Sequence, residues 1–241
     1  MIFRVLSNLH TRLSFSKDSG KIFKALIHKS PPGTPYNMTK SFTLNDGSRI
    51  PWLAFGTGTA LYKQDAADHV RLAIENNITH LDGAQVYNNE DSLGAGIKAS
   101  GKPRSELFIV TKLHSLQTGE TIKESLKVSL AKLGLDYVDL FLIHSPYEAR
   151  NEKKLSQWWE GMEEVKHAGL AKSIGVSNFY VEDLKVILET AKVVPSVNQV
   201  GLGFQFFFFL MSYLSTRSNS IRISTKLQRR PTNSVRSMAS P

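Results

Sequence analysis

Short apolar runs alternate with longer amphipathic stretches from residue 38 to residue 200, and this alternation constrains the fold more than any other feature. Six apolar runs are short enough to be strands, at 52–57, 79–84, 107–113, 137–144, 171–178 and 196–200. The stretches between them carry apolar residues at helical spacing, at 66–76, 90–99, 118–133, 154–167 and 181–191. Strands that alternate with helices predict a parallel sheet with the helices packed outside it.

The fold class that this order predicts is α/β, and within it the closed (β/α)8 TIM barrel. A complete barrel of this kind takes about 250 residues, so the segment 38–200 supplies roughly six of its eight β/α units. We therefore expect an incomplete barrel. A short hairpin is expected before it at 42–50, because Asn45, Asp46 and Gly47 form a turn sequence between alternating apolar residues.

The net charge of +9 is carried by the two ends of the chain. Residues 1–37 contribute +5 and residues 201–241 contribute +6, whereas the segment 38–200 has a charge of −2. A folded domain that binds nucleic acid carries its basic residues on its own surface. Because the middle segment is slightly acidic, we expect no nucleic-acid partner.

The first 37 residues are basic, contain several serines and hold a single acidic residue, Asp18. This composition is typical of a mitochondrial presequence. The alternative is a disordered extension that precedes a start at Met38.

The chain has no cysteine, which excludes disulfides and thiolate metal sites and fits a reducing compartment. We therefore expect a cytoplasmic protein, with the mitochondrion as the alternative.

After Val200 the alternation stops. Residues 201–214 are apolar without a helical or strand period, and the residues from 215 onward are mostly polar and basic. The apolar run is shorter than the roughly 18–20 residues that span a bilayer, so no membrane span is expected. We expect residues 201–241 to be disordered and foreign to the domain. A translated intron or an out-of-frame segment is the favoured origin, because codons for Phe and Leu are rich in T.

Four polar residues each close a strand-like run, and this is the sharpest chemical feature of the sequence. Asp82, Lys112, His144 and Asn178 follow one another at separations of 30, 32 and 34 residues, about one β/α unit each. Parallel strands of a barrel all finish at the same end, which is called the mouth here, and barrel active sites are built there. The spacing therefore predicts that these four side chains gather at the mouth.

Tyr87 follows Asp82 by five residues, in the loop after the same strand. A nearby ammonium group such as that of Lys112 lowers the pKa of a phenol from its usual value near ~10. Asp82 would hold that lysine charged and in place, and His144 would orient a substrate oxygen. Such a set suits the protonation of an oxyanion that forms on a carbonyl.

Five segments in this order resemble motifs of the aldo-keto reductase family. They are residues 80–90 with Leu93 and Gly94, residues 110–113, residues 141–146, residues 172–179 and residues 197–199. The resemblance covers about 38–200, roughly the first half to two thirds of a family member. It implies reduction of aldehydes or ketones to alcohols, with NADPH as the cofactor bound across the barrel mouth.

The resemblance also implies a role for each site residue. Tyr87 would be the general acid, Lys112 and Asp82 would adjust the pKa of its hydroxyl, and His144 would orient the substrate. Tyr87 and His144 would therefore both bind the substrate. Cofactor contacts would come from Gly56, Thr57, Asp82, Ser177, Asn178 and Gln199. Trp52 is expected in the core, and at least one of Trp158 and Trp159 is expected to serve packing.

The family's seventh and eighth strands and its late basic segment, which holds the adenosine 2′-phosphate, have no counterpart in this chain. An unclosed barrel leaves its outer strands unpaired and its interior open to water, so we expect impaired folding.

If the chain folds, we expect a monomer that acts on a small-molecule carbonyl. The histidines show no ligand spacing, so no metal is expected. The alternative to an enzyme is a splice remnant or a non-enzymatic interaction module.

Overall fold

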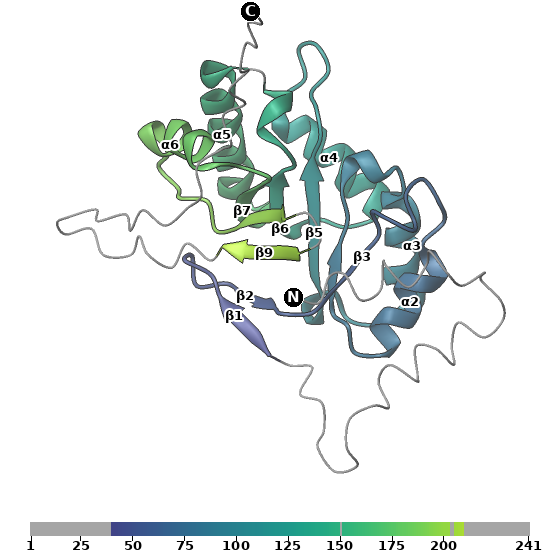
Figure 1. The fold of residues 1–241 in the computed structure, drawn as a ribbon. Helices are drawn as coiled ribbons and strands as arrows, with labels where there is room; N and C mark the ends of the chain where they lie inside the picture. Colours follow the sequence, from purple (N-terminus) through teal and green to yellow (C-terminus); the bar gives the residue numbers. More distant parts are fainter. Residues whose placement is uncertain (1–39, 150, 203–204, 210–241) are drawn as a thin grey trace, which may run out of the picture.

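The computed structural model describes residues 40–149, 151–202 and 205–209, and its central feature is a sheet that curls into an open half-barrel (Figure 1). The strands follow one another in chain order: β3 (Ala54–Gly56), β4 (His80–Asp82), β5 (Phe108–Leu113), β6 (Val138–Ile143), β7 (Ala171–Ser177), β8 (Asn198–Leu202) and β9 (Gln205–Phe209). The helices are α2 (Ala67–Glu75), α3 (Glu90–Ser100), α4 (Ile122–Leu133), α5 (Glu152–His167) and α6 (Val181–Thr190). Single 3₁₀ turns lie at η2 (Gln85–Tyr87), η3 (Arg104–Glu106) and η4 (Pro146–Glu148).

Strands β3 to β8 are parallel, and one α-helix lies in each crossover between them. The pairing runs without a gap, with Gly56 opposite Asp82 at the first pair and Ser177 opposite Gln199 at the last. The helices lie on the outer side of the curled sheet (Figure 1). The predicted α/β class and the incomplete barrel of six parallel strands are therefore confirmed.

Both faces of the central strands are apolar and buried. Alternate residues point to opposite sides of a strand. Ile109 of β5 and Phe141 of β6 belong to the large outer cluster that packs against the helices. Val110 and Leu142 belong to a smaller cluster inside the barrel. Lys112 lies two residues after Val110 on β5, so its side chain points to the same inner side of the barrel.

A hairpin covers the end of the barrel at which the parallel strands begin. Strands β1 (Ser41–Thr43) and β2 (Arg49–Pro51) pair antiparallel, as the sequence predicts, and Gly47 supplies the positive φ of +84° that their turn needs. Leu44 and Ile50 of the hairpin are part of the inner cluster. Asp46 fixes the turn to the barrel, since its carboxylate lies 3.0 Å from Lys166 Nζ.

Helix α4 begins later than the sequence predicts, at Ile122 instead of residue 118. Thr121 caps it, because its hydroxyl accepts from the Glu124 amide while the Glu124 carboxylate accepts from the Thr121 amide. Gly119 just before the cap has a φ of +82°, which is outside the helical region. The residues that extended the predicted helix belong to the preceding loop.

Strand β9 corrects one expectation about the segment 201–241. Residues Gln205–Phe209 pair antiparallel with Asn198–Leu202 of β8, although the sequence shows no strand period there. Backbone groups at an open strand edge pair with any extended segment that reaches them, whatever its side-chain pattern. The predicted disorder therefore does not hold for these five residues, nor for Gly201 and Leu202 at the end of β8.

The remaining terminal predictions fall on residues 1–39 and 210–241, which lie outside the described residues. The basic extension at 1–37 and the basic tail stay predictions. In the described part of the chain, no helix is both long enough and apolar enough to cross a membrane.

Of the three tryptophans, Trp158 and Trp159 of α5 are buried, and the Trp159 indole donates to the Val193 carbonyl at 2.9 Å. The packing role predicted for at least one of them is confirmed. Trp52 is only half-buried, so the structure places it at the margin of the core instead of inside it.

Candidate active site

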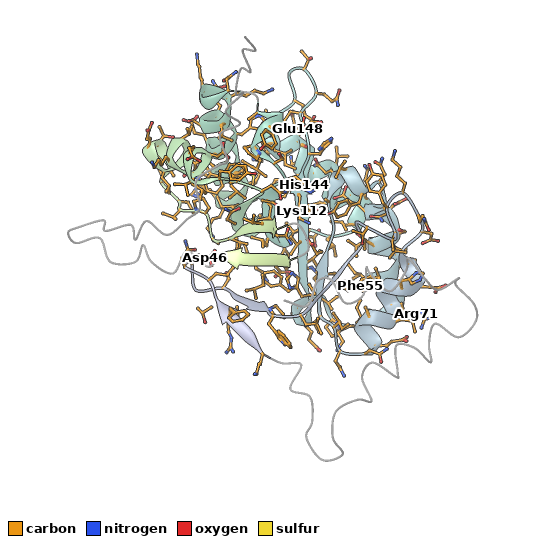
Figure 2. The ribbon with its side chains drawn as sticks, in the orientation of Figure 1. Asp46, Phe55, Arg71, Lys112, His144 and Glu148 are labelled. Carbon is orange, nitrogen blue, oxygen red and sulfur yellow. The ribbon has the colours of Figure 1, made fainter. Side chains whose placement is uncertain are left out.

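The structure brings together four of the polar residues that the sequence places after strands. Asp82 is the last residue of β4, Lys112 lies near the end of β5, and His144 directly follows β6. Tyr87 ends the turn η2 that follows β4. Lys112 and His144 are neighbours in Figure 2, at the barrel mouth and away from the hairpin residue Asp46.

Lys112 and Asp82 form a buried ion pair. The Lys112 Nζ lies 2.5 Å from Asp82 Oδ1 and donates to the Gly83 carbonyl at 2.9 Å. Their side chains are 1% and 9% exposed, so solvent does not screen the pair. Burial alone would lower the pKa of Lys112, but Asp82 and Tyr87 outweigh burial and raise it. The lysine is therefore charged at neutral pH.

The Tyr87 hydroxyl lies above this pair, 3.5 Å from Lys112 Nζ. Burial raises the pKa of Tyr87, while the Lys112 ammonium opposes the change, and the net direction is upward. From the sequence, the Lys112 ammonium is expected to lower this pKa. That effect is present but smaller than the cost of placing a phenolate in a site with little water. The phenol is therefore protonated at neutral pH and is able to donate.

His144 packs against Tyr87 at the mouth. Their ring centroids are 5.6 Å apart and the rings are nearly perpendicular, at 85°. Burial, with the Lys112 charge as the second cause, lowers the pKa of His144 to about 4. The imidazole is therefore neutral at pH 7 and offers both a donor and an acceptor nitrogen.

A second set of polar side chains lies across the mouth, at the end of β7 and near the start of β8. The Asn178 amide donates to the His144 carbonyl at 3.0 Å and to Ser177 Oγ at 3.1 Å. The Gln199 amide donates to Asp82 Oδ2 at 3.3 Å. Asn178 has a left-handed φ of 61°, a conformation that Asn tolerates better than most residues. Through the contact of Gln199 with Asp82, these polar side chains are connected to the Lys112–Asp82 ion pair.

The end of β3 and the loop after it hold Gly56 and Thr57, which are expected from the sequence to contact the cofactor. Gly56 is exposed at the mouth. Thr57 is fully buried, its hydroxyl donates to Asn89 Oδ1 at 3.2 Å, and its carbonyl accepts from the Asn89 amide at 3.0 Å. Its backbone N–H donates to the Asp82 carbonyl at 3.1 Å. Thr57 is therefore buried with each of its polar groups bonded within the protein.

Sequence reasoning missed Gly58, which touches the Tyr87 ring. A Cβ at this position would lie 2.6 Å from Tyr87 Cζ, closer than real Cβ contacts allow. The neighbouring Tyr62 presents its ring edge to Tyr87 with centroids 6.5 Å apart. The second glycine of Gly56-Thr57-Gly58 is the signal that could have shown a close approach of the backbone.

Among the described residues, no group of three His, Asp or Glu side chains is arranged to hold a metal ion. His80 begins β4, at the end of the barrel opposite the mouth, and is buried against Phe108, with Nδ1 2.9 Å from the Pro51 carbonyl oxygen.

Comparison with known proteins identifies the family. Residues 52–205 match the aldo/keto reductase family, which is more than half of the chain. The chain belongs to the aldo/keto reductase family. The expectation drawn from the five sequence motifs is therefore confirmed.

This aldo/keto reductase chain has well-matched relatives among characterised proteins. It is 41% identical over 162 residues to an NAD/NADP-dependent indole-3-acetaldehyde reductase of Schizosaccharomyces pombe, covering 64% of this chain and 56% of the relative. It is 37% identical over 167 residues to a glyoxal reductase of Bacillus subtilis, covering 69% and 59%. The chain thus spans little more than half the length of these relatives.

Solved structures show the same partial overlap. An aldo/keto reductase from Brucella melitensis matches with a TM-score of 0.61 and 35% identity, covering 68% of this chain and 63% of that chain. A Bombyx mori aldo-keto reductase, solved in complex with NADP, matches with a TM-score of 0.58 and 34% identity, covering 68% and 59%. The family match at residues 52–205 contains the parallel strands β3 to β8, which carry the site.

Proposed function

We propose that this chain reduces an aldehyde or ketone to an alcohol with NADPH. The observation that carries the proposal is the buried Lys112–Asp82 ion pair directly beneath the Tyr87 hydroxyl, with neutral His144 beside it. The relatives support the chemistry, because their names describe reductases of carbonyl compounds that use NAD or NADP. When bound, NADPH would supply the hydride.

In this proposal Tyr87 donates the proton. Its O–H gives a proton to the carbonyl oxygen as the C=O bond becomes a C–O single bond, and the electron pair of the O–H bond stays on the phenolate. The Lys112 ammonium, 3.5 Å away, stabilises the phenolate as it forms. Asp82 keeps that ammonium charged and in place. One hydride and one proton added to C=O give the alcohol, so the step balances.

His144 orients the substrate oxygen. Because its pKa is lowered to about 4, it carries no charge at pH 7 and does not compete with Tyr87 as an acid. Its packing against the Tyr87 ring, with centroids 5.6 Å apart, supports this role. His144 and Tyr87 would thus hold the carbonyl oxygen between them.

The residues at the end of β7 and near the start of β8 would bind the nicotinamide carboxamide. Asn178 is exposed at the mouth, and Ser177 and Gln199 lie next to it. Together they supply amide and hydroxyl groups that both donate and accept, as a carboxamide requires. Gly56, exposed at the mouth, would leave room for the cofactor, and buried Thr57 would hold this loop in place through its hydrogen bonds to Asn89.

NADPH binding and carbonyl reduction test the proposal. We expect NADPH to quench the protein fluorescence saturably and the chain to reduce a small aldehyde. Tyr87→Phe should keep NADPH binding and lower kcat by at least about a hundredfold, since it removes the general acid. Tyr147→Phe is the matched control, because Tyr147 is 68% exposed and lacks the ion pair beneath it. Absence of binding, or an unchanged rate in Tyr87→Phe, contradicts the proposal.

We also infer that the enzyme is a cytoplasmic monomer. Its cysteine-free composition suits a reducing compartment. Light scattering behind a sizing column tests the monomer, and a mass near twice 26.9 kDa would contradict it.

A further inference from the structure

Gln85 lies two residues before Tyr87, in the single turn η2 that carries Tyr87 to the mouth. The turn follows an extended Ala84 and ends at Asn88, whose φ is +52°. Its internal hydrogen bonds are few, from Tyr87 N to the Ala84 carbonyl at 3.0 Å and from Asn88 N to the Gln85 carbonyl at 3.2 Å. Since 3₁₀ hydrogen bonds have poor geometry, the orientation of so short a turn depends on its neighbours.

The side chain of Gln85 ties this turn to two other elements. His114 directly follows β5, and its backbone amide donates to Gln85 Oε1 at 2.9 Å. The Gln85 Nε2 donates to Ser125 Oγ at 3.0 Å and to Ser129 Oγ at 3.1 Å, both on α4. Both donors and the acceptor of the amide are therefore used within the protein.

The hydrogen bonds continue behind the sheet to the strand that carries Lys112. Ser129 Oγ donates to Glu90 Oε2 at 3.2 Å, and Thr111 Oγ1 donates to Glu90 Oε1 at 2.6 Å. Glu90, Thr111 and Ser129 are all buried, at 2%, 0% and 1% exposure. Thr111 precedes Lys112 on β5. The network thus links the Tyr87 turn, the Lys112 strand and α4.

We propose that Gln85 is a positioning residue that sets the distance between the Tyr87 hydroxyl and the Lys112 ammonium. This inference rests on the proposed function for its effect on the rate. The other contacts of Tyr87 are packing of its ring against Gly58, Tyr62 and His144, and one hydrogen bond that its carbonyl accepts from Lys63 N at 2.9 Å. Gln85 alone among these residues ties the turn to both β5 and α4.

Fluorine NMR of the full chain labelled with fluorotyrosine tests the inference without relying on activity. The Tyr87 signal is assigned by its loss in Tyr87→Phe. Gln85→Met removes the hydrogen bonds and keeps the length of the side chain. Asn45→Leu is the matched control, because Asn45 Nδ2 donates one hydrogen bond to the Pro195 carbonyl, at 3.1 Å, far from the mouth.

We expect the Tyr87 signal to shift or broaden in Gln85→Met and to stay unchanged in Asn45→Leu. We also expect kcat to fall about tenfold or more in Gln85→Met, while the Kd for NADPH changes less than about twofold, because only the geometry of proton transfer is disturbed. If Gln85→Met does not fold, Ser129→Ala replaces it in both measurements.

An unchanged Tyr87 signal with unchanged kcat in the folded variant overturns the inference, and so does an equal shift in Asn45→Leu. If the unsubstituted chain reduces no carbonyl, the proposed function fails. The positioning role is then decided by the Tyr87 signal alone.

Discussion

Gly58 is the residue whose lack of a side chain sets how closely the loop after β3 approaches the proton donor. The atoms that a Cβ at 58 would meet are Cζ and both Cε atoms of the Tyr87 ring, at 2.6 and 2.9 Å. An aromatic ring cannot bend away as the end of a flexible side chain can. Either the ring or the loop must move to admit a methyl group.

We therefore expect Gly58→Ala to displace the Tyr87 hydroxyl and to lower kcat about tenfold or more, since misplacement of a reacting group by about 1 Å is costly. Steady-state kinetics of carbonyl reduction measures the effect. Thr59→Ala, at the exposed neighbouring residue, is the control and should keep the parent rate. Equal rates in Gly58→Ala and the parent would show that the ring has room.

His80 makes stability depend on pH. Burial lowers its pKa from 6.5 to about 4 in the folded chain. Between these values the unfolded chain binds a proton that the folded chain does not, so the free energy of unfolding falls as the pH drops from 6.5 to 4. The shift corresponds to a loss of about 3 kcal/mol at roughly 1.4 kcal/mol per pH unit.

Urea titrations at several pH values between 7.5 and 4.5 measure this loss. His80→Asn keeps a donor for the Pro51 carbonyl but does not titrate, so its stability should vary less with pH than that of the parent. The pKa of His144 is also lowered to about 4, so part of the pH dependence of stability remains in both proteins. Identical slopes for the two proteins would rule out His80 as a source.

At the scale of elements, β9 is the strand that covers the open edge of β8. Its register pairs Val200 with Phe207 and Leu202 with Gln205. An edge strand that gains a partner has its amide groups protected from solvent. The pairing is antiparallel, unlike the pairing of β3 to β8, because β9 follows β8 after a connection too short for a crossover helix.

Phe207→Pro should open this pair. Proline removes a backbone N–H and is poorly accommodated in a ladder, so we expect faster hydrogen exchange for the amides of Asn198–Leu202. Exchange in β5, in the middle of the sheet, should not change. Phe42→Pro, in β1 of the separate hairpin, is the control variant. Exchange in β8 that is fast already in the parent would contradict the pairing in solution.

At the scale of the whole molecule, the hairpin β1–β2 completes the interior of the half-barrel. Ile50 is 4% exposed and lies in one cluster with Val110, Leu140 and Leu142 of the central strands. Phe42 on the same hairpin is 55% exposed. The hairpin therefore presents one face to the barrel interior and the other to solvent.

We expect Ile50→Ala to lower the free energy of unfolding by about 2–5 kcal/mol, the range for removing a buried aliphatic side chain. Phe42→Ala should change it by less than about 0.5 kcal/mol. Urea unfolding followed by tryptophan fluorescence compares the two. Equal losses would mean that the hairpin does not contribute to the core.

The strands, the helices and the ends at which polar residues gather could be predicted from the sequence. Strand-like runs ending in Asp82, Lys112 and His144 recur at the spacing of one β/α unit, and parallel strands bring such ends to one edge. The sequence predicts the start of α4 too early, at residue 118, because periodicity cannot distinguish the polar residues of the loop before Thr121 from a first helical turn.

The sequence by itself determined the order of strands and helices, the parallel sheet and the residues at its mouth, because these depend on local periodicity and on the direction in which strands run. The tertiary structure alone decided the net pKa of Tyr87, the contact of its ring with Gly58 and the Gln85 network. Each of these depends on distances between segments from different strands, loops and helices. The spacing of residues along the chain does not predict burial and packing between such segments.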